Sequence, residues 1–187
     1  MTIKHFNWLA PIYDWLAPPA DPDRLKELLA LPQEGWLLDA GGGTGRVAAL
    51  LAPFMDRAVV LDASRPMLRQ STKKSGLQPV QGEVQNLPFP NESFGRILVV
   101  DALHHFAHQP RAAEELLRVL KPGGRLLIEE FNIHRLPIKL LAYVEKILLM
   151  GSLFSSPSEI EALFAATGAT TSTYDGGGLS VWIVAEK

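Results

Sequence analysis

The sequence predicts a single α/β domain in which helices cover both faces of a mostly parallel β-sheet. Short apolar runs alternate with helical patterns along most of the chain, and strands this apolar are typical of parallel sheets buried on both faces. Two final strand patterns are separated by three glycines, which indicates an antiparallel hairpin at the sheet edge. The 187 residues suit one domain. We therefore expect a doubly wound, seven-stranded, mostly parallel sheet with an antiparallel C-terminal edge hairpin.

Each expected element follows from a local signal in the sequence. Apolar runs of strand length predict β-strands at residues 36–40, 58–61, 79–81, 97–100, 126–128, 171–174 and 179–185. Helical patterns predict helices at residues 6–16, 21–31, 46–51, 66–75, 111–120, 137–150 and 156–167. Asp21 and Ser64 are expected to cap the second and fourth of these helices, and Ser156 with Glu159 forms a capping-box pattern at the last.

Composition excludes several classes of protein. The formal net charge is −2, so the chain has no overall basic bias toward nucleic acid, and it has no cysteine for disulfides, zinc sites or nucleophiles. Polar residues interrupt the apolar start of the chain, and three charges interrupt the apolar stretch 136–154, so we expect neither a signal peptide nor a membrane span. The expectation is a cytoplasmic protein with one domain over residues 1–187, an N-terminal helical lid at 1–33 and an inserted helical lid segment at 132–157.

The strongest motif is a glycine-rich turn between the first expected strand and the next helix. Gly41, Gly43 and Gly45 allow a tight turn, close approach of a ligand to the main chain and close packing of the helix. The turn does not match the dinucleotide pattern G-x-G-x-x-G, because the third glycine would fall on Arg46, and it lacks the lysine of a phosphate-binding loop. A purely geometric role for these glycines is the alternative.

Acidic residues stand at the ends of the expected parallel strands. They are Asp39, Asp62, Glu83, Asp101, Glu129 and Glu130. Parallel strands bring their carboxyl ends to one edge of the sheet, where open α/β folds bind ligands. An acidic pocket would repel a pyrophosphate but suits a ligand with hydroxyls, amines and positive charge, such as S-adenosylmethionine. Solvated strand ends or helix caps are the alternative for any one of these acids.

Six stretches, taken together and in order, resemble a known family. They are residues 38–45, 61–68, 81–89, 94–100, 103–106 and 118–124. Over about residues 36–131 the chain is similar to the class I S-adenosylmethionine-dependent methyltransferases, in particular the branch that includes the ubiquinone/menaquinone-biosynthesis methyltransferases. The resemblance implies a Rossmann-like methyltransferase fold with S-adenosylmethionine as the cofactor.

The resemblance also implies how these motifs hold the cofactor. The glycine turn lies under its methionine part, Asp62 accepts hydrogen bonds from the ribose diol, and Met67 covers one face of the adenine. Glu83-Val84 stands where the family usually has Asp-Ala at the adenine edge, and Asp101 or the carbonyl before it meets the ammonium. The implied cofactor-binding residues are Asp39, Gly41, Gly42, Gly43, Gly45, Asp62, Ala63, Met67, Glu83, Val84 and Asp101.

Two side chains are candidates for the chemistry of methyl transfer. The reaction mainly needs alignment of the reacting atoms, with a base only where the acceptor must lose its proton early. His105, in a Leu-His-His stretch after the fourth strand, suits proton transfer near neutral pH, and a pocket-shaping role is the alternative. Tyr13, in a Tyr-Asp pair similar to that of many relatives, either lines the acceptor pocket or simply packs. We expect no metal, because no carboxylate motif completes a site with His104, His105 and His108.

The acceptor is expected to be a small, apolar molecule. Residues 136–150 are apolar apart from two lysines and one glutamate, a wider apolar face than one core contact needs. This face lines the pocket, packs on a second subunit in a homodimer, touches a membrane surface, or forms a buried lid. We expect methyl transfer as the function. A non-catalytic S-adenosylmethionine-binding protein and an NAD(P)-dependent oxidoreductase are the alternatives, and a nucleic-acid substrate is disfavoured because no basic stripe is present.

Overall fold

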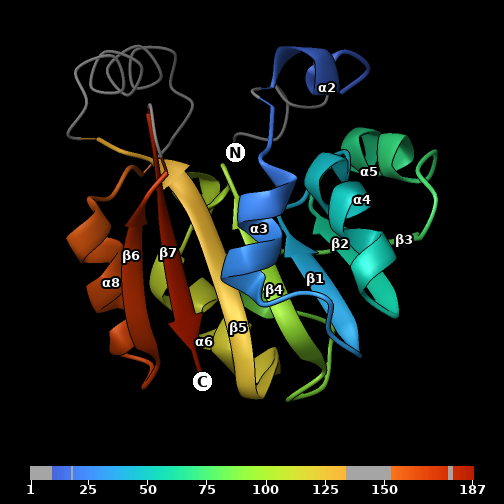
Figure 1. The fold of residues 1–187 in the computed structure, drawn as a ribbon. Coiled ribbons are helices and arrows are strands. Elements are labelled where there is room, and N and C mark those ends of the chain that lie inside the picture. Colours follow the sequence, from blue (N-terminus) through green and yellow to red (C-terminus); the bar gives the residue numbers. More distant parts are fainter. Residues whose placement is uncertain (1–9, 18, 134–152, 177–178) are drawn as a thin grey trace.

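A computed structural model of the chain describes residues 10–17, 19–133, 153–176 and 179–187 (Figure 1). The helix expected at 137–150 lies outside the described residues. Of the helix expected at 6–16, the structure describes α2 (Tyr13–Leu16). The remaining expected elements all lie within the described residues, so the sheet and its two helical layers can be compared with the sequence-based expectation.

Seven strands form one sheet. They are β1 (Trp36–Ala40), β2 (Arg57–Asp62), β3 (Leu77–Gln81), β4 (Phe94–Val100), β5 (Leu120–Phe131), β6 (Thr170–Asp175) and β7 (Ser180–Glu186). Their order is β3-β2-β1-β4-β5-β7-β6. The first five strands pair in parallel, whereas β7 runs antiparallel between β5 and β6. The predicted fold class, including the antiparallel C-terminal hairpin, is confirmed.

The position of a strand in the sheet explains its composition. In the central strand β1, Leu38 is fully buried and stands in register with Val59 of β2 and Ile97 of β4. The edge strand β3 instead carries exposed Gln78 and Pro79. Proline is tolerated at an edge because it has no amide hydrogen to donate to a further strand. Since the first five strands are parallel, their carboxyl ends meet along one edge of the sheet.

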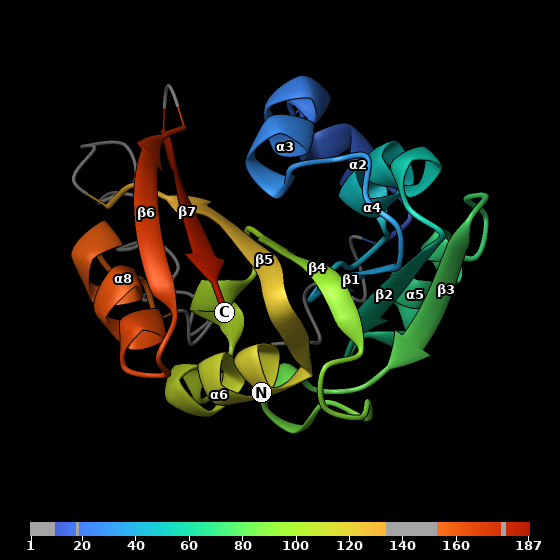
Figure 2. The ribbon, with the colours of Figure 1, turned by 60° about the horizontal axis from the view of Figure 1, so that its bottom comes forward.

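Helices cover both faces of the sheet (Figure 2). They are α3 (Pro22–Leu29), α4 (Arg46–Leu51), α5 (Arg65–Ser71), α6 (Gln109–Val119) and α8 (Pro157–Ala165), with 3₁₀ turns at Ala52–Phe54, Val84–Asn86 and Leu103–His105. On one face, Leu25 of α3 and Leu51 of α4 share a core. On the other face, Leu116 of α6 and Phe164 of α8 share a larger one. None of the described helices is long and apolar enough to cross a bilayer.

The predicted helix caps are confirmed. Asp21 accepts a hydrogen bond from the N–H of Arg24 at 3.0 Å, and the Ser64 hydroxyl accepts one from the N–H of Met67 at 3.3 Å. At the start of α8, Ser156 and Glu159 form the reciprocal capping box. These local bonds satisfy amide hydrogens that have no partner within the helix, which is why short polar side chains mark the helix starts in the sequence.

Several boundaries differ from the expectation. The helix expected to reach residue 31 ends at Leu29, because Ala30 adopts a left-handed conformation with φ of 51°. The helix expected at 66–75 ends at Ser71. Strand β5 is longer than the three residues expected, because the Lys-Pro-Gly-Gly segment after α6 continues directly into the strand. The proline and glycines of this segment predict a loop from local sequence, but in the structure they lie within the extended strand.

Candidate active site

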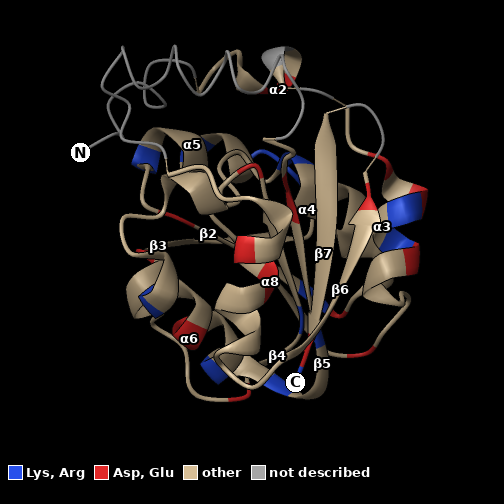
Figure 3. Cartoon of the chain, turned by 90° about the vertical axis from the view of Figure 1, so that its left-hand side faces the viewer, with Lys and Arg blue, Asp and Glu red and all other residues tan. Residues whose placement is uncertain are grey.

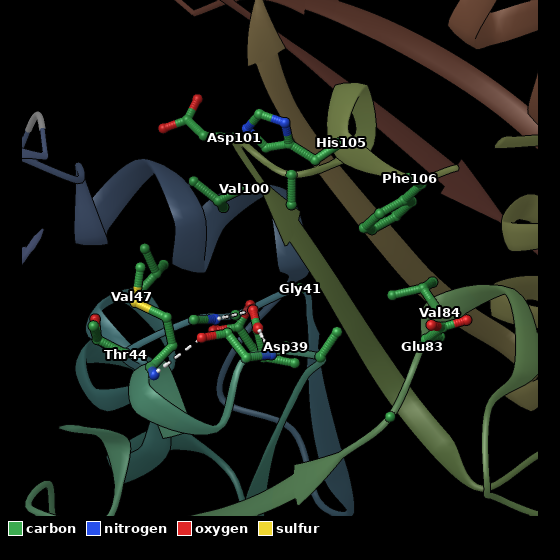
Figure 4. A pocket seen from close by; sticks show the side chains of 18 of the residues that line it. Asp39, Gly41, Thr44, Val47, Glu83, Val84, Val100, Asp101, His105 and Phe106 are labelled. Carbon is green, nitrogen blue, oxygen red and sulfur yellow. Dashed lines mark hydrogen bonds between the residues drawn. The ribbon is translucent and has the colours of Figure 1, made fainter. Parts of the chain in front are cut away.

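A cavity of about 460 Å³ lies at the carboxyl ends of the parallel strands. Tyr13, His105 and all the cofactor-binding candidates except Gly45 line it. Figure 4 labels Asp39, Gly41, Glu83, Val84, Asp101 and His105 among them. The lining also includes residues that the motif argument did not identify, namely Thr44, Arg46, Val47, Ser64, Gly82, Gln85, Ala102, Phe106, Ala107 and Leu153. Apart from Leu153, these residues are next to motif residues in the chain, and that adjacency is the signal that could have found them.

Gly41 brings the main chain close to the opposite wall of the cavity. Its φ is +75°, a conformation that side chains rarely adopt, and an added Cβ would lie 2.9 Å from the Cβ of Ala102. The amide of Gly41 donates to the carbonyl of Leu61 at 2.8 Å, which ties the turn to β2. Only glycine therefore fits here, and the turn presents bare main chain to the cavity.

Gly45 is the one implied cofactor-binding residue that is not among the lining residues, and its surroundings fit the close helix packing expected of this turn. It does not line the cavity, and it is the residue before α4, with φ of +68°. An added Cβ would lie 2.6 Å from the Cδ1 atom of Leu77 and 3.2 Å from a methyl carbon of Val60. The absence of a side chain at Gly45 lets the start of α4 pack closely on β2 and β3, so this glycine serves the packing of the fold.

Asp62 joins the glycine turn to the end of β2. The N–H of Gly43 donates to one carboxylate oxygen at 2.9 Å, and the N–H of Ser64 donates to the other at 2.7 Å. Burial raises the pKa of Asp62, and the two hydrogen bonds oppose that shift. Each carboxylate oxygen has a second lone pair, so this side chain can also accept hydrogen bonds from ligand hydroxyls in the cavity.

Asp39 and Asp101 are carboxyl groups with pKa values near neutrality. Burial, together with the nearby charge of Asp62, raises the pKa of Asp39 to about 7. Burial, together with the charges of Glu129 and Glu130, raises the pKa of Asp101 to about 7. Both groups are destabilised in the charged form by their surroundings, so a positively charged ligand in the cavity would favour their ionisation.

Arg46 is the one Lys or Arg side chain among the described lining residues. It lies at the start of α4 and lowers the pKa values of Asp39 and Asp101, though less than burial raises them. The cavity therefore keeps an excess of acidic side chains. Within the described part of the chain, no three His, Asp or Glu side chains form a group that could hold a metal ion.

Tyr13 and His105 line the cavity from separate parts of the chain, one before the first strand and one after the fourth. In the view of Figure 4, His105 and Asp101 lie above the glycine turn. Burial, with a smaller contribution from His104, lowers the pKa of His105 to about 3. Burial and the charge of Asp101 raise the pKa of Tyr13. Near neutral pH the imidazole is therefore neutral and the phenol protonated.

His104 does not line the cavity. Its Nδ1 atom lies 2.7 Å from the carboxylate of Glu130, and both side chains are buried. The imidazole ring stacks on Phe154, with centroids 4.6 Å apart. The two neighbouring histidines thus have different surroundings, and only His105 is placed to contact a ligand.

Leu153 closes one side of the cavity from the far end of the expected lid segment. Its N–H donates to the carbonyl of His104 at 2.7 Å, and its carbonyl accepts from the side-chain amide of Gln109 at 2.8 Å. Its side chain is 53% exposed. No periodicity or motif marks this residue in the sequence, because its position depends on hydrogen bonds to residues over forty positions away.

A protein family described as "Methyltransferase domain" matches residues 38–128, which include most of the strands and loops around the cavity. The chain belongs to the class I S-adenosylmethionine-dependent methyltransferases. The ubiquinone/menaquinone biosynthesis C-methyltransferase UbiE of Bartonella bacilliformis is 32% identical over an alignment of 145 residues, which covers 72% of this chain and 51% of the relative. The chain therefore spans about half the length of the curated relatives it matches. These findings confirm the resemblance seen in the sequence.

Solved structures of other proteins share this fold. YcgJ of Bacillus subtilis superposes with a TM-score of 0.74 at 25% identity, over 82% of this chain and 70% of that one. The complex of DhpI with S-adenosylhomocysteine superposes with a TM-score of 0.78 at 18% identity, over 99% of this chain and 94% of that one. At the latter identity the likeness supports the fold alone.

The cavity suits S-adenosylmethionine, the cofactor of the family. That molecule combines a positive sulfonium and a positive ammonium with a ribose diol. The carboxyl side chains of Asp39, Asp62, Glu83 and Asp101 line the cavity and match the positive charges and the hydroxyls. At Gly43 the side-chain atoms nearest to an added Cβ lie 3.9 Å or more away, so a ligand can lie directly against the main chain of the turn. The residues present therefore fit the cofactor.

Proposed function

We propose that this chain transfers the methyl group of S-adenosylmethionine to a small, apolar acceptor, with a ring carbon of a quinol as the first candidate. The observation that supports this best is the convergence of Asp39, Asp62 and Asp101 on one cavity beside the glycine turn. These carboxyl groups attract a cationic donor, which when bound supplies an electrophilic methyl group. The quinol follows from the name of the curated relatives, which are ubiquinone/menaquinone biosynthesis C-methyltransferases.

An apolar wall of the cavity supports an apolar acceptor. Ala102 and Phe106 are each less than a tenth exposed and line the cavity. Leu153 adds a further apolar side chain at its rim. Such a wall binds an aromatic ring and excludes water, which would otherwise solvate the reacting atoms.

The titrating groups suggest how a quinol would lose its proton. A base works best when its pKa lies near the working pH. In the cavity without ligand, Asp101 has a pKa of about 7 and meets this condition, whereas His105, with a pKa of about 3, is a weak base. The charge of a bound donor favours the ionised form of Asp101, which is the form that can accept a proton. We therefore assign proton acceptance to the Asp101 carboxylate, hydrogen bonding of the acceptor to the neutral His105, and hydrogen-bond donation to the protonated Tyr13.

A panel of acceptors tests the proposed reaction. Purified protein is mixed with S-adenosylmethionine carrying an isotopically labelled methyl group and with quinols, phenols and amines. Mass spectrometry then identifies any methylated product and the atom that carries the label. We expect label on a quinol carbon. Label on oxygen or nitrogen would replace the proposed acceptor atom, and tight binding of the donor with no product from any acceptor would favour the non-catalytic alternative.

The lids expected at 1–33 and 132–157, the homodimer and the cytoplasmic location stay predictions. Tyr13 and Leu153 support the idea of lids, because each comes from one of these segments and lines the cavity. The homodimer is tested by the mass of the protein in solution, and the location by imaging of the tagged chain in cells.

A further inference from the structure

The helix α2 has little of its own to hold it in place. It is a single turn of four residues with no side-chain cap at its start. Trp15 is 83% exposed, and Ile12, just before the helix, is 51% exposed. An isolated turn of this length is unstable in water, because nucleation fixes several residues for one hydrogen bond. The position of α2 over the end of the sheet, seen in Figures 1 and 3, therefore needs a tertiary contact.

Asp14 supplies that contact. One of its carboxylate oxygens accepts a hydrogen bond from the hydroxyl of Thr44, and the other lies 2.7 Å from the ammonium of Lys74. The same ammonium donates to the main-chain carbonyl of Thr44 at 2.8 Å. Three segments far apart in the sequence thus meet in one closed set of polar contacts: α2, the glycine turn and the turn after α5.

The surroundings of these contacts favour the charged form of Asp14. Partial burial raises its pKa, but the hydrogen bonds from Lys74 and Thr44 outweigh burial, so that the pKa lies below its usual value. Thr44 itself is almost fully buried, whereas about a quarter of the Lys74 side chain is exposed to solvent. The ion pair is thus shielded on the side of the glycine turn.

We propose that Asp14 and Lys74 form a latch that positions Tyr13 at the cavity and couples this position to occupancy of the cofactor site. Tyr13 precedes Asp14 and lines the cavity. Thr44 follows Gly43, whose amide donates to Asp62. A ligand that orders the glycine turn therefore also orders the partner of the latch, and the coupling works in both directions. The role given to Tyr13 rests on the proposed methyl transfer, but the latch itself does not.

Hydrogen exchange tests the latch in the full chain without any reaction. The variants are Lys74→Met, which removes the ammonium, Lys74→Arg, which keeps a cation, and Lys73→Met as a matched control. Lys73 is the neighbouring lysine, and its side-chain contact is with Gln70 of α5, the helix just before it. Exchange of the peptide 10–17 is followed by mass spectrometry with and without S-adenosylhomocysteine.

We expect at least threefold faster exchange of this peptide in Lys74→Met, little change in Lys74→Arg and no change in Lys73→Met. Adding S-adenosylhomocysteine should slow exchange of this peptide in the parent protein, and the slowing should be clearly smaller in Lys74→Met. Unchanged exchange in Lys74→Met would overturn the latch, and equal slowing by the ligand in parent and variant would overturn the coupling. A circular dichroism melt of each variant shows whether it is folded. If Lys74→Met is unfolded, Asp14→Asn replaces it, because this variant removes the charge at the other end of the ion pair and keeps the shape of the side chain.

Activity adds a readout that a purely structural contact would not move. With a methylated acceptor in hand, Lys74→Met should lower kcat at least fivefold while the affinity for S-adenosylhomocysteine falls less than threefold, because Tyr13 serves the acceptor. An unchanged kcat would contradict the positioning of Tyr13. If no acceptor in the panel is methylated, the proposed function fails, while the exchange results still decide whether the latch exists.

Discussion

The imidazole of His104 and the carboxylate of Glu130 lie 2.7 Å apart, and both are buried in the fold. The pair joins the end of β5 to the turn after β4, the turn that also carries His105. The negative charge of Glu130 contributes to the raised pKa of Asp101, after burial and Glu129. A contact outside the cavity therefore influences both the position and the ionisation of groups inside it.

Replacing Glu130 with alanine removes the acceptor of the His104 hydrogen bond from a buried site. A buried polar group that loses its partner typically costs about 1–3 kcal/mol. We expect the free energy of unfolding, measured with urea, to fall by about this amount. Glu130→Gln keeps an oxygen that can accept from Nδ1 and should lose less than half as much. Equal losses in the two variants would show that the hydrogen bond is not what stabilises this region.

Replacing Asp62 with asparagine should weaken binding of S-adenosylhomocysteine. The variant keeps the shape of the side chain but loses its charge, and hydrogen bonds to charged groups contribute about 1.5–3 kcal/mol each. Since about 1.4 kcal/mol corresponds to a tenfold change, we expect the dissociation constant from calorimetry to rise at least tenfold. Asp56→Asn is the control, because Asp56 also accepts a main-chain hydrogen bond, from Gly35 at 2.8 Å, and does not line the cavity. Equal affinities in both variants would remove Asp62 from the cofactor site.

Two glycines of the same turn should respond differently to alanine. Both have positive φ, so each substitution carries backbone strain of about 1–2 kcal/mol. At Gly45 the new Cβ would also overlap Leu77 in the core, whereas at Gly43 the nearest side-chain atoms lie 3.9 Å or more away. We expect Gly45→Ala to have the lower melting temperature of the two. We expect Gly43→Ala to lose more affinity for S-adenosylhomocysteine, and the reverse order for either property would contradict these roles.

Stability without ligand should decrease as the pH rises from about 5 to about 8. The folded pKa values of Asp39 and Asp101 are both about 7, above the value of about 3.9 for an unfolded aspartate. The folded state therefore binds more protons in this window, and the stability from these groups is full below pH of about 4 and lost as the pH passes about 7. Thermal melts at constant ionic strength measure this, and Asp39→Asn should flatten the slope. A parent slope of the opposite sign would contradict the assigned pKa values.

The sheet and most of the cavity could be predicted because they follow from local signals. Apolar runs fix the strands, and parallel pairing then brings Asp39, Asp62 and Asp101 to one edge without further information. The same reasoning went too far at Glu129 and Glu130, neither of which lines the cavity. Neighbouring side chains of a strand point to opposite faces, so Glu129 and Glu130 cannot serve one site, and Glu130 instead contacts His104.

The contacts that place the N-terminal segment could not be predicted from the sequence. Asp14 meets Thr44 and Lys74 across 30 and 60 positions of chain, and no periodicity or motif relates residues so far apart. The sequence also left open which of the three glycines serves helix packing, because a glycine that admits a ligand and one that admits Leu77 look the same in a motif. Both depend on the packing of α4 and α5 on the sheet.

Calorimetric titration of the purified chain with S-adenosylmethionine, S-adenosylhomocysteine and NAD tests the central claim most directly. The acid-lined cavity and the bare glycine turn predict binding of the first two molecules with micromolar or tighter dissociation constants. Asp39, Asp62 and Asp101 would repel the pyrophosphate of NAD, so NAD should produce no binding heat. Micromolar binding of NAD, with no response to S-adenosylhomocysteine, would contradict the account.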